Sequence, residues 1–281
     1  MKRRIIFKDN TTLNDYTNNL YDYYANTESF TAVALEDNLF IGATLPFNHF
    51  YVDASGTNAQ ASNMAVSYWD GTEFQDVVEL TDNTKVGSGT LGQSGFVEFV
   101  TDKNKNWAKE DTVNNSGTEL IDGLGDKTIY DLYWLKIGFS ADLDAVTLNW
   151  LGSVYSNDDD LKLEFPDLVR YEIRELFEYW KETYFEQHCI AAQMIDKELI
   201  NRNVMNNENQ VLSREDLKLA SVQKVAALIY NALGDDYVDN FIAAEKEYLN
   251  RIEKAYVKID TNANARVDVQ ERNPYIGMLY R

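Results

Sequence analysis

The sequence predicts a multidomain protein, in which an antiparallel β-sandwich or jelly-roll-like domain precedes a helical bundle with an extended C-terminal arm. Short apolar runs of strand period fill the first 156 residues, and after Pro166 apolar residues recur every three or four positions. The 281 residues, 44% of them hydrophobic, suffice for cores in two domains. We therefore expect domains at residues 1–156 and 166–260, an acidic linker at 157–165, and a turn with the arm at 261–281.

The β prediction depends on short runs bounded by turn signals. We expect strands at 4–7, 31–35, 39–41, 47–52, 64–69, 95–100, 133–139 and 146–150. Asp70-Gly71 is a tight-turn signal after the strand at 64–69. The Gly- and Asn-rich stretches 82–95 and 114–125 are expected to be loops at the ends of the sandwich. Residues 10–26 have a mixed period and predict no definite element.

A composition break at 156–160 separates the two patterns. Its three consecutive aspartates are most simply a solvated linker, with a metal site as the alternative. From Pro166 a helical pattern extends through Leu199. Its first apolar face comprises Val169, Ile173, Leu176, Phe177, Trp180 and Tyr184.

Two further helices are predicted, which makes about three long helices in the bundle. One begins after Ser213 as its N-cap and ends before Gly234 as its C-cap. The next carries an apolar stripe from Phe241 to Ile259 and is expected to run antiparallel to it.

Charge and composition argue against several functions. The net charge is −20 and no basic patch stands out, which argues against binding to duplex nucleic acid or to an anionic membrane. No apolar run approaches the length of a membrane span, and the N-terminus lacks a signal-peptide core. The single cysteine, Cys189, forms no internal disulfide and is consistent with assembly in a reducing cytoplasm.

No catalytic residues are predicted, and we expect the protein not to be an enzyme. The two histidines are His49 and His188, and neighbours in a helix such as His188 and Cys189 point about 100° apart, so they are not aligned as a pair. Metalloprotease, phosphate-loop and dinucleotide-binding motifs are absent. Trp69, Trp107 and Trp134 could form a sugar-binding platform, although core packing is favoured for them.

One stretch has the spacing of a calcium-binding loop. The six positions that would supply ligands are Asp260, Asn262, Asn264, Arg266 through its carbonyl, Asp268 and Glu271. Ala265 stands where the loop requires Gly, and Pro274 prevents the exiting helix. The alternative is an Asx-rich turn between short strands at 257–259 and 266–269. Apart from this possible calcium ion, no cofactor is predicted.

The last residues are too apolar for a free end, yet Pro274 and Gly277 prevent a helix. We predict that this arm docks on the protein's own body or on a partner. The predicted binding residues are Pro274, Tyr275, Ile276, Met278, Leu279, Tyr280 and Arg281.

Antiparallel helices followed by residues 258–268 and a tail with Pro and Tyr resemble head–tail connector (adaptor) proteins of tailed bacteriophages, over Pro166 to Arg281. The stretches 68–74, 95–99 and 133–137 resemble β-sandwich modules appended to phage structural proteins. The second domain is then expected to be a bundle of the adaptor type. The appended β-domain departs from the small helical adaptors, so this subunit could build the ring, decorate it, or do both.

The resemblance implies a structural virion protein in the phage neck, between the portal and the tail. Its partners would be further copies of itself in a dodecameric ring, the portal protein, and a downstream stopper or tail protein. DNA would pass through without sequence-specific binding, and assembly would occur in the host cytoplasm. The alternatives are a carbohydrate-binding β-sandwich component of a tail or receptor-binding apparatus, and a calcium-regulated scaffold.

Overall fold

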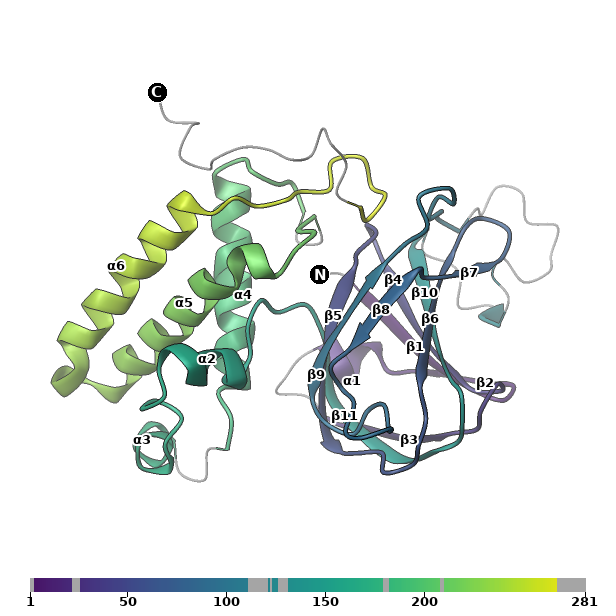
Figure 1. Cartoon of the computed structure of the whole chain (residues 1–281), viewed down its shortest axis with the longest axis horizontal. Coiled ribbons are helices and arrows are strands. Elements are labelled where there is room, and N and C mark those ends of the chain that lie inside the picture. Colours follow the sequence, from purple (N-terminus) through teal and green to yellow (C-terminus); the bar gives the residue numbers. More distant parts are fainter. Residues whose placement is uncertain are drawn as a thin grey trace. The chain divides into compact units, whose positions relative to one another are not determined.

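The structure is a computed structural model that describes residues 3–21, 26–110, 121, 123–125, 131–178, 182–207 and 210–266. The chain divides into two compact units (Figure 1). The β unit comprises the residues up to Gly152 together with Asn262–Arg266, and the helical unit contains Ser153–Thr261.

The elements that the structure describes in the β unit are eleven strands and the short helix α1. They are β1 (Arg3–Asp9), β2 (Thr12–Asp15), α1 (Thr17–Tyr21), β3 (Glu28–Ala32), β4 (Asn38–Ala43), β5 (His49–Gly56), β6 (Met64–Trp69), β7 (Phe74–Asp76), β8 (Glu79–Asp82), β9 (Gly95–Val100), β10 (Tyr133–Phe139) and β11 (Leu143–Gly152).

These strands form two antiparallel sheets. The six-stranded sheet has the order β2-β1-β4-β10-β6-β7, and the five-stranded sheet has the order β3-β11-β5-β9-β8. In the first sheet, Ala43 pairs with both Arg3 and Tyr133. The start of β1, the end of β4 and the start of β10 therefore meet at one end of this sheet.

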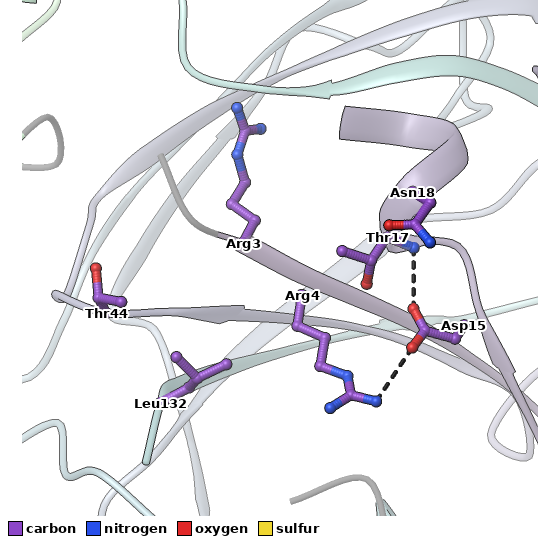
Figure 2. Close-up of a pocket in the computed structure, with 7 residues that line it drawn as sticks. All are labelled: Arg3, Arg4, Asp15, Thr17, Asn18, Thr44 and Leu132. Carbon is purple, nitrogen blue, oxygen red and sulfur yellow. Dashed lines mark hydrogen bonds and ion pairs between the residues drawn. The ribbon is translucent and has the colours of Figure 1, made fainter. Parts of the chain in front are cut away.

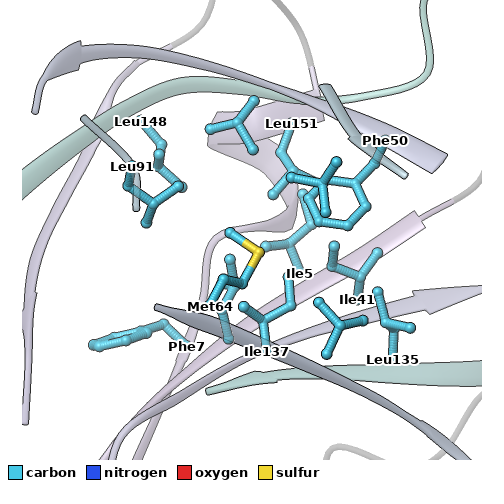
Figure 3. Close-up of a cluster of buried hydrophobic side chains, with 14 of the residues drawn as sticks. Ile5, Phe7, Ile41, Phe50, Met64, Leu91, Leu135, Ile137, Leu148 and Leu151 are labelled. Carbon is cyan, nitrogen blue, oxygen red and sulfur yellow. The ribbon is translucent and has the colours of Figure 1, made fainter. Parts of the chain in front are cut away.

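The main core lies between the two sheets (Figure 3). Strand alternation directs Ile5 and Phe7 of β1 into this core, where they join buried residues such as Phe50 and Leu148 of the other sheet. On the opposite face of the six-stranded sheet, Trp134 belongs to a second buried cluster. This sheet is thus covered on both faces.

The helical unit contains six described helical segments. They are α2 (Asp158–Glu164), α3 (Tyr171–Phe177), α4 (Phe185–Asn201), α5 (Glu215–Leu233), the 3-10 helix η2 (Asp235–Tyr237) and α6 (Val238–Lys254). Lys224 of α5 forms an ion pair with Glu245 of α6 at 2.8 Å, and Asp216 before it pairs with Lys258 at 3.3 Å, so the two long helices run antiparallel.

The predicted antiparallel β-domain agrees with the structure, but the predicted helical bundle of the adaptor type is wrong. The chain combines sheets of six and five strands with helices of unequal length, in which the short α2 and α3 stand beside α4, α5 and α6, and this is not the predicted bundle of the adaptor type. Where the sequence predicts one helix from Pro166 to Leu199, α3 ends at Phe177 and α4 begins at Phe185.

Side-chain acceptors explain the start of a new helix at Phe185. The backbone N–H of Tyr184 donates to both carboxylate oxygens of Asp158 at 3.1 Å, and that of Phe185 donates to the Thr183 hydroxyl at 3.1 Å. These acceptors satisfy donors that a continuous helix would have bonded internally. The apolar period therefore did not predict the break between the two helices. It also placed Leu176 on the apolar face, although this side chain is 66% exposed.

Residues 157–165, predicted to be a linker, form helix α2 instead. Asn157 and Asp160 make a reciprocal capping box, in which each side chain accepts the other's backbone N–H at 3.0 and 3.2 Å. The run of three aspartates occupies the first turn, where negative charge is favourable. The aspartates were therefore a helix-start signal.

Candidate functional site

A buried hydrogen-bond network joins four segments of the helical unit. The Ser156 hydroxyl lies 2.8 Å from Nδ1 of His188 on α4 and 2.7 Å from the hydroxyl of Ser221 on α5. Nε2 of His188 lies 3.2 Å from Oδ1 of Asp158, the first residue of α2. The sequence alone does not predict this convergence, because nothing in its pattern relates Ser156 to Ser221.

Serine, histidine and aspartate are the residue types of a hydrolase triad, but this arrangement is not one. Ser156, His188 and Ser221 are 0% exposed, so a substrate cannot reach either hydroxyl. The serine also bonds to Nδ1 and the aspartate to Nε2, the reverse of the triad arrangement. The network therefore ties α2, α4 and α5 together rather than activating a nucleophile.

The charge in this network is held by Asp158. Burial alone would raise the pKa of its carboxyl, but hydrogen bonds and charge from His188, with further bonds from Thr183 and the Tyr184 backbone, lower it below its usual value. Asp158 is thus favoured as a carboxylate, matched by donors on α4 and the segment before it.

A second carboxyl of the helical unit behaves in the opposite way. The hydroxyl of buried Tyr155 donates to Asp196 on α4. Burial raises the pKa of Asp196 to about 7, although the bond from Tyr155 lowers it. The same burial, together with the Asp196 charge, raises the pKa of Tyr155 well above its usual value.

The predicted calcium loop is described only in part, since Asp268 and Glu271 lie outside the described residues. Asp260 is buried, and its backbone N–H and C=O bond to the backbone and side chain of Gln210 at 2.7 and 2.8 Å. The Asn264 side chain accepts the backbone N–H of Arg266 at 2.8 Å. Within the described ranges, no group of three or more His, Cys, Asp or Glu is placed to hold a metal ion. Calcium binding stays a prediction.

The alternative interpretation, an Asx-rich turn between short strands at 257–259 and 266–269, is described only in part, because residues 267–269 lie outside the described residues. Ile259 forms an isolated bridge with Val211. Ala265, at the position where the calcium loop requires Gly, has a left-handed φ of 58° and packs in the β-unit core. Arg266 donates to the Lys105 carbonyl at 3.1 Å. The loop thus anchors the chain in the β unit.

The three tryptophans considered for sugar binding are all buried. Trp107 packs in the main core, and Trp69 and Trp134 pack in the second cluster. Nε1 of Trp134 donates to the buried Glu110 carboxylate at 2.7 Å. An exposed aromatic platform from these residues is therefore ruled out, and core packing is confirmed for them.

The helical unit presents two apolar surfaces to solvent. On α6, Val238, Ile242 and Leu249 are 44%, 54% and 47% exposed, and their spacing of four and seven residues puts them on one helix face. We call this the α6 surface. On α2 and α3, Leu163 and Leu176 are 81% and 66% exposed, and we call these the α2–α3 surface. Helix α5 packs against both α6 and the α2 and α3 helices.

A pocket of about 500 Å³ lies at the end of the six-stranded sheet where β1 begins, and we call it the β1 pocket (Figure 2). Arg4 pairs with Asp15 at 3.1 Å, and Asp15 also accepts the backbone N–H of Thr17 at 3.0 Å. The described residues that line it are Arg3, Arg4, Asp15, Thr17, Asn18, Thr44 and Leu132. Two cationic residues and one anionic residue are therefore among those that line this pocket in an otherwise acidic protein.

The predicted arm, Pro274–Arg281, lies outside the described residues. Its binding role stays a prediction. Among the helices that the structure describes, none is both long and apolar enough to cross a membrane.

Comparisons with known proteins add little to this geometry. No family model matches the sequence, and no curated protein matches it. Among solved structures, a variant of CpGH89 from Clostridium perfringens, in complex with its substrate GlcNAc-alpha-1,4-galactose, is similar with a TM-score of 0.29 and 10% identity. The match covers 77% of this chain and 20% of that chain. A likeness at this level defines neither a shared fold nor a shared activity.

Proposed function

We propose that the protein is a non-enzymatic structural component that assembles head to tail into a ring, as a head–tail connector in the neck of a tailed bacteriophage. The ring would lie between the portal and the tail. The phage assignment rests on the sequence resemblance over Pro166–Arg281. The head-to-tail assembly rests on the two apolar surfaces of the helical unit.

Two different exposed apolar surfaces on one unit are the property that supports a ring. A two-fold dimer uses the same surface on both copies, whereas a ring needs two distinct surfaces that complement each other. The α6 surface and the α2–α3 surface lie on different helices, and α6, α2 and α3 all pack on α5. We infer that the α6 surface of one copy contacts the α2–α3 surface of the next.

Burial of these side chains would supply the association energy. Each well-buried Leu or Ile contributes about 1.5–3 kcal/mol before the costs of association. A repulsive net charge of −20 on each copy opposes assembly at low ionic strength. Assembly is therefore expected to strengthen as added salt screens this repulsion.

Complementary surface variants test the head-to-tail contact. Ile242→Lys with Leu249→Lys removes the α6 surface, and Leu163→Lys with Leu176→Lys removes the α2–α3 surface. By light scattering, each variant alone is expected to stay monomeric. An equimolar mixture should form dimers, because each variant retains the surface that the other lacks.

The matched control is Val86→Lys in the β unit, an exposed apolar residue outside both surfaces. It should assemble like the unaltered protein. If the unaltered protein stays monomeric at high concentration, with and without portal, the proposal is wrong. If either double variant still assembles, the contact is placed on the wrong surface.

The phage assignment has a separate test. A chain ending at Asn273 lacks the predicted arm and should fold but lose binding to the cognate portal protein in a pull-down. Absence of portal binding by the full-length chain would remove the connector assignment, even if rings form. The carbohydrate-binding alternative is not carried further, because its three tryptophans are buried.

A further inference from the structure

The β1 pocket combines features that suit a small anionic ligand. The start of β1, the end of β4 and the start of β10 meet there, so its walls belong to paired strands rather than to a loop alone. A volume of about 500 Å³ is within the range of small-molecule sites.

The central charged group is Arg4, which is held in place by its neighbours. Nη2 of Arg4 lies 3.1 Å from Oδ2 of Asp15, and the other oxygen of Asp15 accepts the Thr17 backbone N–H at 3.0 Å. The Arg4 side chain is only 13% exposed. A guanidinium fixed in this way requires little reordering to bind an anion.

Arg3 supplies a second positive charge at the pocket. Because neighbouring strand residues point to opposite faces, its side chain leaves β1 away from that of Arg4 (Figure 2). Its guanidinium lies over the Trp150 ring at 4.9 Å and donates to the Leu151 carbonyl. Arg3 therefore adds long-range attraction, while Arg4 is the group placed for direct contact.

The rest of the lining favours an anion that also carries hydroxyl groups. Thr17, Asn18 and Thr44 provide hydroxyl and amide groups, and Leu132 provides one apolar wall. The formal charge of the described lining residues is +1, in a chain of net charge −20. A positive pocket on an acidic protein attracts small anions and repels acidic macromolecules.

We propose that the β1 pocket binds a small polyhydroxylated anion, with its carboxylate or phosphate bonded to Arg4 in competition with Asp15. This inference goes beyond the structural function proposed above and does not rest on it. Carboxylate and phosphate share the recognition chemistry, since a guanidinium bonds to either through two parallel N–H groups.

Titrations with three related sugars test the proposal. Glucuronate, glucose 6-phosphate and neutral glucose are added to the full-length protein, and binding is followed by calorimetry and by amide NMR shifts. At least one of the two anions should bind, with shifts in β1 and α1, and glucose should bind at least tenfold more weakly. The stronger of the two anions identifies the charged group. Equal binding of glucose, or no binding of either anion, overturns the proposal.

Two substitutions should move the affinity in opposite directions. Arg4→Gln removes the charged donor and is expected to weaken anion binding about tenfold or more. Asp15→Asn removes the competing carboxylate and is expected to strengthen it severalfold. The matched control is Arg170→Gln, which breaks the exposed ion pair of Arg170 with Asp167 in the helical unit and should leave the affinity unchanged.

Opposite changes in affinity for Arg4→Gln and Asp15→Asn distinguish a loss of ligand recognition from a folding defect. A destabilised pocket would lose affinity in both variants, and thermal melts of each variant report folding independently. Weaker binding by Asp15→Asn would contradict the assigned competition and overturn the proposal.

Discussion

The two units differ in where they place polar and apolar groups. The β unit encloses a large apolar core between its sheets, with a second cluster on the outer face of one sheet. The helical unit encloses a smaller apolar cluster and a polar network around His188. Both units also expose apolar side chains, such as Leu35 in the β unit and Leu163 in the helical unit. The comparison indicates that the β unit has the larger apolar core, whereas in the helical unit a buried hydrogen-bond network around His188 supplements a smaller apolar cluster.

The largest loss of stability is expected from a substitution in the core of the β unit. Phe50→Ala removes a fully buried ring between the sheets and should lower the free energy of unfolding by about 3–5 kcal/mol. Urea denaturation with a tryptophan fluorescence readout measures it. Val86→Ala, at an exposed position, is the control and should change stability by no more than about 0.5 kcal/mol. Similar effects of the two substitutions would contradict the assigned core.

The next largest effect is expected in the helical unit. His188→Ala leaves Ser156 and Asp158 without their shared partner, at a cost of about 2–4 kcal/mol, because buried polar groups lose their hydrogen bonds. Denaturation followed by far-UV circular dichroism, which reports helices, measures this loss. Ser55→Ala, which removes an exposed hydrogen bond to Asn149, is the control and should have little effect. A near-neutral His188→Ala would show that the unit does not depend on this network.

The pH dependence of the helical unit sharpens the comparison. Because the pKa of Asp196 is raised to about 7 in the folded protein, the native state binds more protons than the unfolded state between pH 4 and 7. Its contribution to stability is therefore fully present below the unfolded pKa and is lost as the pH rises toward 7. Thermal melts should show that Asp196→Asn flattens this decline. The substitution should stabilise the protein more at pH 8 than at pH 4, and a pH-independent difference would contradict the raised pKa.

The smallest change in stability is expected in the segment Asn262–Arg266, which belongs to the β unit. Ala263 has a φ of 59°, in the left-handed region that favours glycine. Ala263→Gly should stabilise the protein by about 0.5–1 kcal/mol, because glycine adopts this φ without strain. The greater conformational entropy of glycine in the unfolded chain reduces this gain. Ala243→Gly, at an exposed position inside α6, should instead destabilise it by about 1 kcal/mol. A loss of stability for Ala263→Gly would show that no strain is present there.

The sequence predicted the strands better than the helices, for physical reasons. The alternation at Met64–Trp69 and Tyr133–Phe139 depends on local burial, and both segments form strands with those bounds. The break between Phe177 and Phe185 depends on Asp158, which is distant in sequence and is brought there by folding. Helix α2 was missed because its aspartates were interpreted by charge alone, although Asn157 and Asp160 have the spacing of a capping box.

The candidate sites were less predictable than the fold. The Ser156, His188 and Ser221 side chains come together from three segments, and no spacing relates them. The β1 pocket likewise depends on strand pairing that brings Thr44 and Leu132 beside Arg4. Core packing of Trp69 and Trp134 could be predicted, since large aromatic residues in strands usually pack in a core, whereas Trp107 lies outside the strands and is buried all the same.

The return of Asn262–Arg266 to the β unit places Ser153–Thr261 between two segments of that unit. Within the described residues, the polypeptide leaves the β unit after Gly152 and enters it again at Asn262, so two covalent crossings join the units there. A single proteolytic cut near residue 153 would therefore leave the β unit associated with the rest of the chain through the buried Ala265. A shortened chain ending at Gly152 would lack a piece of its own core. An exchange of the helical unit for another domain would have to reproduce both of these connections to the β unit.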